Sequence, residues 1–151
     1  MNTRIQRTVL AGVLGTAIMT VIMMIAPMMG MPKMSPPNML AGMLGMPIVI
    51  GWIMHFMIGI VFAFAYTYLC IFKHKISNVW LKGAVFGIIA FVFAQIMMGI
   101  MGVMIPMPKM EGSMILTAIG SLMGHIIFGM AVAKTVGEAY CSSGTCKTKT
   151  A

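Results

Sequence analysis

Two histidines are the residues best suited to chemistry in an otherwise apolar chain. His55 and His125 lie inside long hydrophobic runs, and ionisable groups in such runs suggest function by default. Two histidines from facing helices are able to bind a soft metal ion, the iron of a haem, or a quinone carbonyl. A packing role is the alternative, because a neutral histidine bonds readily to a backbone carbonyl or a polar neighbour; the candidate partners are Gln95, Thr16, Thr20, Ser121 and Trp52.

Methionine is the second chemical signal. The chain has 22 methionines, and apart from Met1 they fall only between Met19 and Met57 and between Met97 and Met130. A thioether is a soft ligand that suits Cu(I), and by the same softness Ag(I). Pairs such as Met19 and Met23 are four residues apart, which places two sulfurs on one helix face. We expect the capturing sulfurs to be those of Met24, Met28, Met31, Met34, Met97, Met101, Met107 and Met110. The alternative is a flexible methionine surface for lipid or a partner subunit.

Composition indicates the class of protein that carries these groups. Sixty per cent of the 151 residues are hydrophobic and only 8% are charged, against roughly 25% charged in soluble domains. Four apolar runs, each long enough to cross a bilayer as a helix, fall at about 9–29, 48–72, 83–104 and 114–136. The sequence therefore predicts an all-α integral membrane domain over 1–137 with four transmembrane helices. A mobile polar cytoplasmic tail over 138–151 would follow.

The basic residues predict the orientation. Eight of them fall on one side of the predicted spans and two, Lys33 and Lys109, on the other. By the positive-inside rule both termini and the loop near His74 are cytoplasmic. The net charge of +8 is then a topology signal and a contact for anionic lipid, and nucleic acid is not an expected partner. In the outer segment 30–47, Asn38 is placed to cap a short helix over Met39–Leu44.

The two halves of the chain resemble each other, which indicates a duplicated helical hairpin over about 7–72 and 80–137. Gly12 opens the first span much as Gly83 opens the third, and the outer motif Met-Pro-Lys-Met occurs twice. Two stripes share the same four-residue spacing: Gly51, His55, Gly59 and Ala63 in the second span, and Ser121, His125, Gly129 and Ala133 in the fourth. Both hairpins would enter the membrane in the same sense, as parallel repeats.

Small residues at this spacing allow close helix packing, so we expect the second and fourth helices to be central, with their stripes facing each other or the first and third helices. Further small pairs, Gly83 with Gly87 and Ala11 with Gly15, predict similar contacts.

Enzymatic chemistry has little support in these residues. The two acidic residues, Glu111 and Glu138, lie outside the predicted spans, and the chain carries no zinc-protease or nucleophile-elbow motif. Cys141 and Cys146 have four residues between them, whereas paired metal-site cysteines usually have two. We interpret the protein as a non-enzyme and those cysteines as part of the tail, with receipt of copper as the alternative.

The stretch Gly51-Trp52-Ile53-Met54-His55-Phe56, with Gly59 and the hairpin around it, resembles small bacterial four-span membrane proteins of an uncharacterised family. The resemblance covers 7–137 and implies the fold and an inner-membrane location, but no activity. From the residues themselves we expect a protein that binds or moves Cu(I) or Ag(I), as a homodimer or part of a larger complex if it transports. The alternative is a non-catalytic accessory or structural subunit of a membrane complex, with haem b or quinone between the histidines.

Overall fold

The computed structural model describes residues 3–33, 35–69, 76, 78–104 and 113–137. These residues form helices and connecting turns, with no strand in the described part. The elements in chain order are α1 (Thr3–Ile25), the 3₁₀ helix η1 (Ala26–Met29), α2 (Pro36–Leu44), α3 (Ile48–Leu69), α4 (Val79–Met104) and α5 (Met114–Val136). The segments 105–112 and 138–151, and with them Cys141 and Cys146, lie outside the described residues.

Four helices are long and apolar enough to cross a membrane, which confirms that prediction. The candidate spans are Arg4–Met29, Ile48–Tyr68, Val79–Met104 and Met114–Val136. The first and third begin four or five residues before the predicted starts, because a helix continues through flanking polar residues such as Arg7 and Lys82. Large apolar side chains are exposed along every one of these helices. A helix that is apolar on all sides is suited to lipid, where the backbone must be bonded within the helix.

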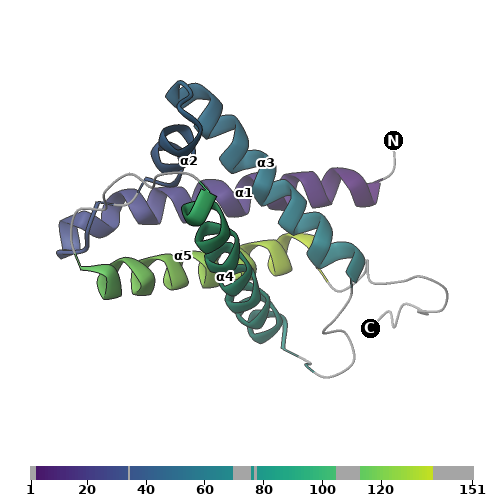
Figure 1. Cartoon of the computed structure of the whole chain (residues 1–151). Coiled ribbons are helices and arrows are strands. Elements are labelled where there is room, and N and C mark those ends of the chain that lie inside the picture. The colour runs from purple at the N-terminus through teal and green to yellow at the C-terminus, as the bar shows by residue number, and fades with distance from the viewer. Residues whose placement is uncertain (1–2, 34, 70–75, 77, 105–112, 138–151) are drawn as a thin grey trace, which may run out of the picture.

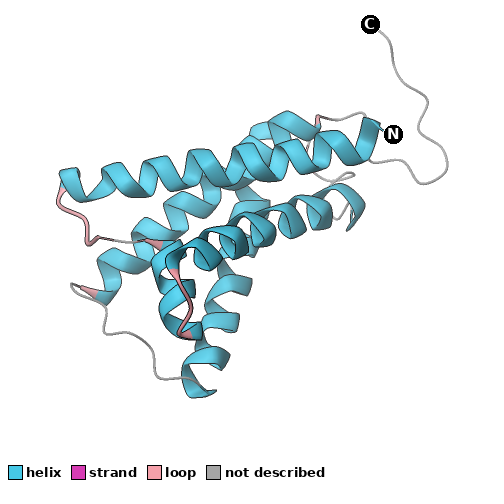
Figure 2. Cartoon of the chain, turned by 90° about the horizontal axis from the view of Figure 1, so that it is seen from above, coloured by secondary structure: helices cyan, strands magenta, loops and turns pink. Residues whose placement is uncertain are grey.

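Helices α1 and α5 form the centre of the bundle. They lie side by side and run in opposite directions, while α3 and α4 cross them obliquely (Figures 1 and 2). Helix α1 packs against both α3 and α5, α5 also packs against α4, and α3 meets α5 only briefly. We expected α3 to be central with α5, and that was wrong: α1 takes the place of α3. The reason is that α1 has two packing faces, with Ala11 and Gly15 toward α5 and Gly12 and Thr16 toward α3.

Glycines allow the close contacts of α1 with α3 and of α4 with α5. In the first, a Cβ on Gly12 of α1 would lie 2.6 Å from the Cα of Ile60 of α3. In the second, a Cβ on Gly83 of α4 would lie 2.6 Å from the Cα of Met130 of α5. No Cβ fits at either distance, so each pair of backbones approaches this closely only because the side chain is missing. The stripes of α3 and α5 therefore face α1 and α4, which is one of the two expected arrangements.

The short helix in segment 30–47 is present, but its start differs from the prediction. Helix α2 begins at Pro36, two residues before Asn38, and its N-cap is Ser35, whose side chain makes no capping hydrogen bond. Asn38 is therefore inside the helix and is not its cap. Proline is favoured in the first turn of a helix because its missing N–H has no partner there anyway. The helix ends at Gly45, in the left-handed conformation with φ 61°.

One end of the bundle carries all of the described basic side chains except Lys33. Arg4 donates from Nη2 to the carbonyl of Thr67 at 3.3 Å and lies over the ring of Tyr68. On the other pair of helices, Lys134 of α5 lies over the ring of Trp80 of α4. The first contact joins α1 to α3 and the second joins α5 to α4 at the same end of the molecule. Cations over aromatic rings are typical of the boundary between the apolar core and water.

Candidate functional site

His55 is buried against α1 and has a defined partner there. The residue is 8% exposed, and Nε2 of its ring lies 3.1 Å from the hydroxyl oxygen of Thr20. Thr20 in turn donates its hydroxyl hydrogen to the carbonyl of Thr16 at 2.7 Å. A carbonyl only accepts, so that hydrogen is committed, and Nε2 of His55 must be the donor to Thr20. The neutral ring is therefore protonated on Nε2, and the lone pair is on Nδ1.

His125 is held by its own helix and has the opposite tautomer. Its Nδ1 lies 2.7 Å from the carbonyl oxygen of Ser121, one turn earlier in α5. Because the carbonyl accepts, Nδ1 carries the hydrogen and Nε2 carries the lone pair. The ring packs edge-on against Phe91 of α4, with 5.8 Å between ring centroids. Among the described residues neither lone pair has a hydrogen-bond partner.

The two histidines meet different side chains on the neighbouring helix. Phe91 lies 71 residues after Thr20, as Gly83 lies 71 residues after Gly12. In the α1–α3 pair that position supplies a hydroxyl to the histidine, and in the α4–α5 pair it supplies an aromatic edge. The phenyl ring cannot accept the ring N–H as a hydroxyl oxygen does. His125 accordingly donates to the Ser121 carbonyl instead.

Helix α1 carries two buried methionines that pack against α5. Met19 is 6% and Met23 is 4% exposed. Both pack on Gly124, the residue before His125: a Cβ at Gly124 would lie 3.4 Å from the sulfur of Met23 and from Cγ and Cε of Met19. Thr20 lies between them in sequence and faces α3. One turn of α1 therefore presents two thioethers to α5 and the His55 partner to α3.

The two histidines lie on helices that share a neighbour. The helices that carry them, α3 and α5, both pack against α1 and also meet each other briefly. The resulting set is His55, His125, Met19 and Met23, with Thr20 orienting one ring. None of these side chains carries a negative charge: the set offers imidazole nitrogens and thioether sulfurs as possible metal ligands. Within the described residues there is no cluster of three or more His, Cys, Asp or Glu side chains.

The methionines expected to capture metal are mostly at the surface. Met24 is 66% and Met28 is 86% exposed, Met97 is exposed, and Met31 and Met101 are half-buried. Met34, Met107 and Met110 lie outside the described residues. None of the described members of the expected set is fully buried. Met19 and Met23, a pair that the four-residue spacing also indicates, are the sulfurs that the fold buries.

The remaining predicted residues lie in different surroundings. Gln95 is exposed on α4, while the hydrogen bonds of the histidines go to two other candidates, Thr20 and Ser121. Gly59, Ala63, Gly129 and Ala133 are buried on the faces that meet α1 and α4. Gly51 packs instead under α2, where a Cβ would collide with the carbonyl oxygen of Pro37. Ser121 contributes through its backbone carbonyl.

The arrangement is suited to binding a soft cation between neutral ligands. Histidines that ligate metals nearly always donate their other ring N–H to a protein oxygen, which fixes the tautomer and the ring orientation. His55 and His125 both meet that condition. Imidazole nitrogens and thioethers together favour copper over hard cations, which prefer carboxylates.

Comparison with known proteins gives a family for this chain. Residues 2–143 match the model of a family of unknown function, DUF6789. No curated protein and no solved structure matches the chain. Since the match extends over nearly the whole sequence, the chain belongs to DUF6789, a family of unknown function.

Proposed function

We propose that this protein binds, and in an assembled state moves, a monovalent soft metal ion, Cu(I) or Ag(I), in a membrane. The ligands are Nδ1 of His55 and Nε2 of His125, with the sulfurs of Met19 and Met23 completing the site. The role is binding or transport and not catalysis. The protein would act in the inner membrane of a bacterium.

The observation that supports this proposal is the hydrogen bonding of the two rings. Each imidazole donates its single N–H to a protein oxygen, Thr20 Oγ1 or the Ser121 carbonyl, and keeps one lone pair without a partner among the described residues. Among the described residues only Nε of Arg4 is a buried side-chain nitrogen or oxygen without a hydrogen-bond partner, so the two remaining ring nitrogens are open to an incoming ligand. A metal ion supplies the missing partner for both rings.

The charge of the site favours a monovalent ion. No acidic side chain lies in the four candidate spans, so nothing in these helices neutralises a divalent cation. Cu(I) and Ag(I) carry one charge and accept neutral sulfur and nitrogen ligands. A net charge of +1 in lipid is also far less costly than +2, because the desolvation cost grows with charge.

We further infer a duplicated hairpin with both termini on the cytoplasmic side. The α1–α3 and α4–α5 pairs each close on a glycine pair, Gly12 with Gly59 and Gly83 with Gly129. Four basic residues, Arg4, Arg7, Lys82 and Lys134, are at the end of the bundle where α1 and α4 begin, and Lys33 is at the other. That bias supports the cytoplasmic assignment by the positive-inside rule.

The test is metal content of the detergent-purified full chain after loading with Cu(I) under reducing conditions. We expect about one copper per chain in the wild type. The double variant His55→Ala/His125→Ala should retain at most a tenth of that copper at the same free concentration. His74→Ala is the matched control, because His74 lies outside both predicted stripes, and it should bind like the wild type.

The same sample separates the alternative function. An accessory subunit that holds haem between the histidines would show a Soret band after purification and would lose it in the double variant. Wild-type protein that binds no copper, or a double variant that binds as much as the wild type, would overturn the proposal. The histidines would then be packing residues of a structural membrane protein.

A further inference from the structure

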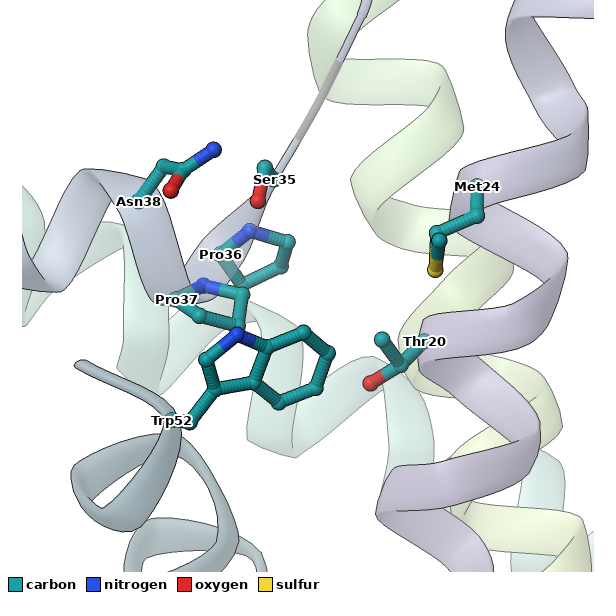
Figure 3. Close-up of a pocket in the computed structure, with 7 residues that line it drawn as sticks. All are labelled: Thr20, Met24, Ser35, Pro36, Pro37, Asn38 and Trp52. Atoms are coloured by element: carbon teal, nitrogen blue, oxygen red, sulfur yellow. The ribbon is translucent and has the colours of Figure 1, made fainter. Parts of the chain in front are cut away.

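A pocket opens on the outer side of His55, between the ends of three elements. It has a volume of about 290 Å³ and is lined by Thr20, Met24, Ser35, Pro36, Pro37, Asn38 and Trp52. The sulfur of Met24 and the hydroxyl of Thr20 project from α1 into this space, and the indole of Trp52 faces them from α3 (Figure 3). The start of α2 forms the remaining wall.

The contact between α2 and α3 keeps this pocket in place. Gly51 of α3 has no side chain, and this lets the carbonyl of Pro37 rest directly on the α3 backbone. Pro37, Ala41 and Met43 are buried in that contact. Two successive prolines at the start of α2 also restrict the backbone there, because their rings fix φ. The backbone of 35–38, which forms this wall of the pocket, is therefore held in position by the fold.

Thr20 connects the pocket to His55. Its side chain lines the pocket, and its hydroxyl oxygen accepts the Nε2 hydrogen of the buried ring at 3.1 Å. A ligand in the pocket is thus separated from the histidine by a single side chain. The pocket is at the outer end of α1, where an ion arriving from outside would first meet the molecule.

The lining selects the chemistry of the ligand. It contains one soft sulfur, one indole face and neutral oxygens, with no charged side chain. A cation is attracted by the face of tryptophan, the strongest of the aromatic side chains in this respect. A helix start usually favours anions, but Pro36 and Pro37 have no N–H, and the N–H of Met39 is bonded to the carbonyl of Ser35. The end of α2 therefore has little to offer an anion.

We propose that this pocket is the outer vestibule of the metal site, where an incoming Cu(I) or Ag(I) ion is held between the Met24 sulfur and the Trp52 indole before it reaches His55. This inference rests on the proposed function, since it assigns an entrance to the same site. It gives a role to Met24, which the bundle leaves exposed to 66%.

The experiment uses tryptophan fluorescence with Ag(I), which binds like Cu(I) and is not oxidised by air. The chain has two tryptophans, so the Trp80→Phe variant of the full chain reports on Trp52 alone. We expect saturable quenching of Trp52 emission as Ag(I) is added. Adding Met24→Leu should raise the Ag(I) concentration at half-quenching at least tenfold. Met28→Leu, a change at the neighbouring surface sulfur, should leave it unchanged.

A third variant separates the vestibule from the deep site. In Trp80→Phe with His55→Ala/His125→Ala we expect the Trp52 quenching to persist while total bound Ag(I) falls. If quenching disappears together with the histidines, Trp52 only senses the deep site, and the vestibule is wrong while the proposed function stands. Stoichiometric Ag(I) with no Trp52 response, or a response that Met24→Leu does not alter, would also overturn the vestibule and leave the proposed function standing. If no variant binds Ag(I), both proposals fail.

Discussion

Thr20 is the residue that decides how His55 is presented. Its hydroxyl receives the Nε2 hydrogen and so fixes the tautomer in which the Nδ1 lone pair is available to a metal ion. We predict that Thr20→Val, which keeps the shape and removes the oxygen, weakens Cu(I) binding by about 10–100-fold, the usual effect of losing a partner behind a metal ligand. The loss of stability should be small, about 0.6 and at most about 1.7 kcal/mol, as for other hydrogen bonds between membrane helices. Competition with a chromophoric Cu(I) chelator measures the affinity.

Thr16→Val is the matched control for that change. Thr16 is one turn away on the same face of α1, but its hydroxyl donates only to the carbonyl of Gly12 at 2.8 Å. It should bind copper like the wild type, and Thr20→Ser should also bind well because it restores the oxygen. Equal losses in Thr16→Val and Thr20→Val would show that the hydroxyl of Thr20 has no particular role.

The buried sulfurs give a second prediction at this scale. Met19→Leu/Met23→Leu should lower the affinity for Ag(I) at least tenfold, because both soft ligands beside Gly124 are removed. Leucine fills nearly the same volume, so the cost in stability should remain below about 1.5 kcal/mol. Met28→Leu/Met29→Leu is the control, since these side chains are 86% and 80% exposed. Isothermal titration with Ag(I) checks both, and an unchanged affinity in the buried pair would remove Met19 and Met23 from the site.

The sequence identified the histidines and their spacing but not which sulfurs accompany them. Met19 with Met23 and Met24 with Met28 are both i,i+4 pairs, and the two pairs are offset by about 140° around the helix. Only the packing of α1 between α3 and α5 decides which pair is buried. The same is true of Thr20, which is one of several polar candidates in the sequence and becomes the partner of His55 because α1 crosses α3 at that point.

At the scale of elements, the contact of α4 with α5 depends on small residues. A Cβ on Gly87 would lie 2.7 Å from the Cα of Ile126 and would collide with the carbonyl of His125. We predict that Gly87→Ala destabilises the protein by about 1–3 kcal/mol, the usual cost of overpacking. Gly99→Ala in the same helix has nothing within 4 Å of the new Cβ. It should keep or raise the melting temperature in detergent, because alanine is the better helix former; equal effects of the two changes would contradict the packing described.

The contact of α1 with α3 allows a test by rescue. A Cβ on Gly59 would collide with the hydroxyl of Thr16 and lie 3.2 Å from its Cβ. Gly59→Ala should therefore lower the melting temperature, and the further change Thr16→Ala should recover most of the loss because it removes the colliding oxygen. Thr16→Ala alone should have only a small effect. If the double variant melts no higher than Gly59→Ala, the two residues are not in contact.

The sequence was enough to predict the helices and the faces on which they pack. It was not enough to predict which helix covers each face. The stripes at four-residue spacing on α3 and α5 mark a contact surface, since i and i+4 share one face. They do not say which helix covers it. The central place of α1 follows from its second face, formed by Ala11, Gly15 and Met19 against Phe128 and Val132, and this face is hard to distinguish from lipid-facing positions in a helix that is apolar all round.

At the scale of the whole molecule, the orientation of the chain in the membrane decides whether the Trp52 pocket is an entrance or an exit for metal. In the proposed orientation Lys33 faces outward, and Asn78, at the start of α4, faces the cytoplasm. In a background with Cys70, Cys141 and Cys146 changed to Ser, we predict that Lys33→Cys is labelled by a membrane-impermeant maleimide in intact cells. Asn78→Cys should be labelled only after permeabilisation, and both positions are exposed in the structure. The reverse pattern would place the Trp52 pocket on the cytoplasmic side, where it would serve as an exit for metal and not as the entrance.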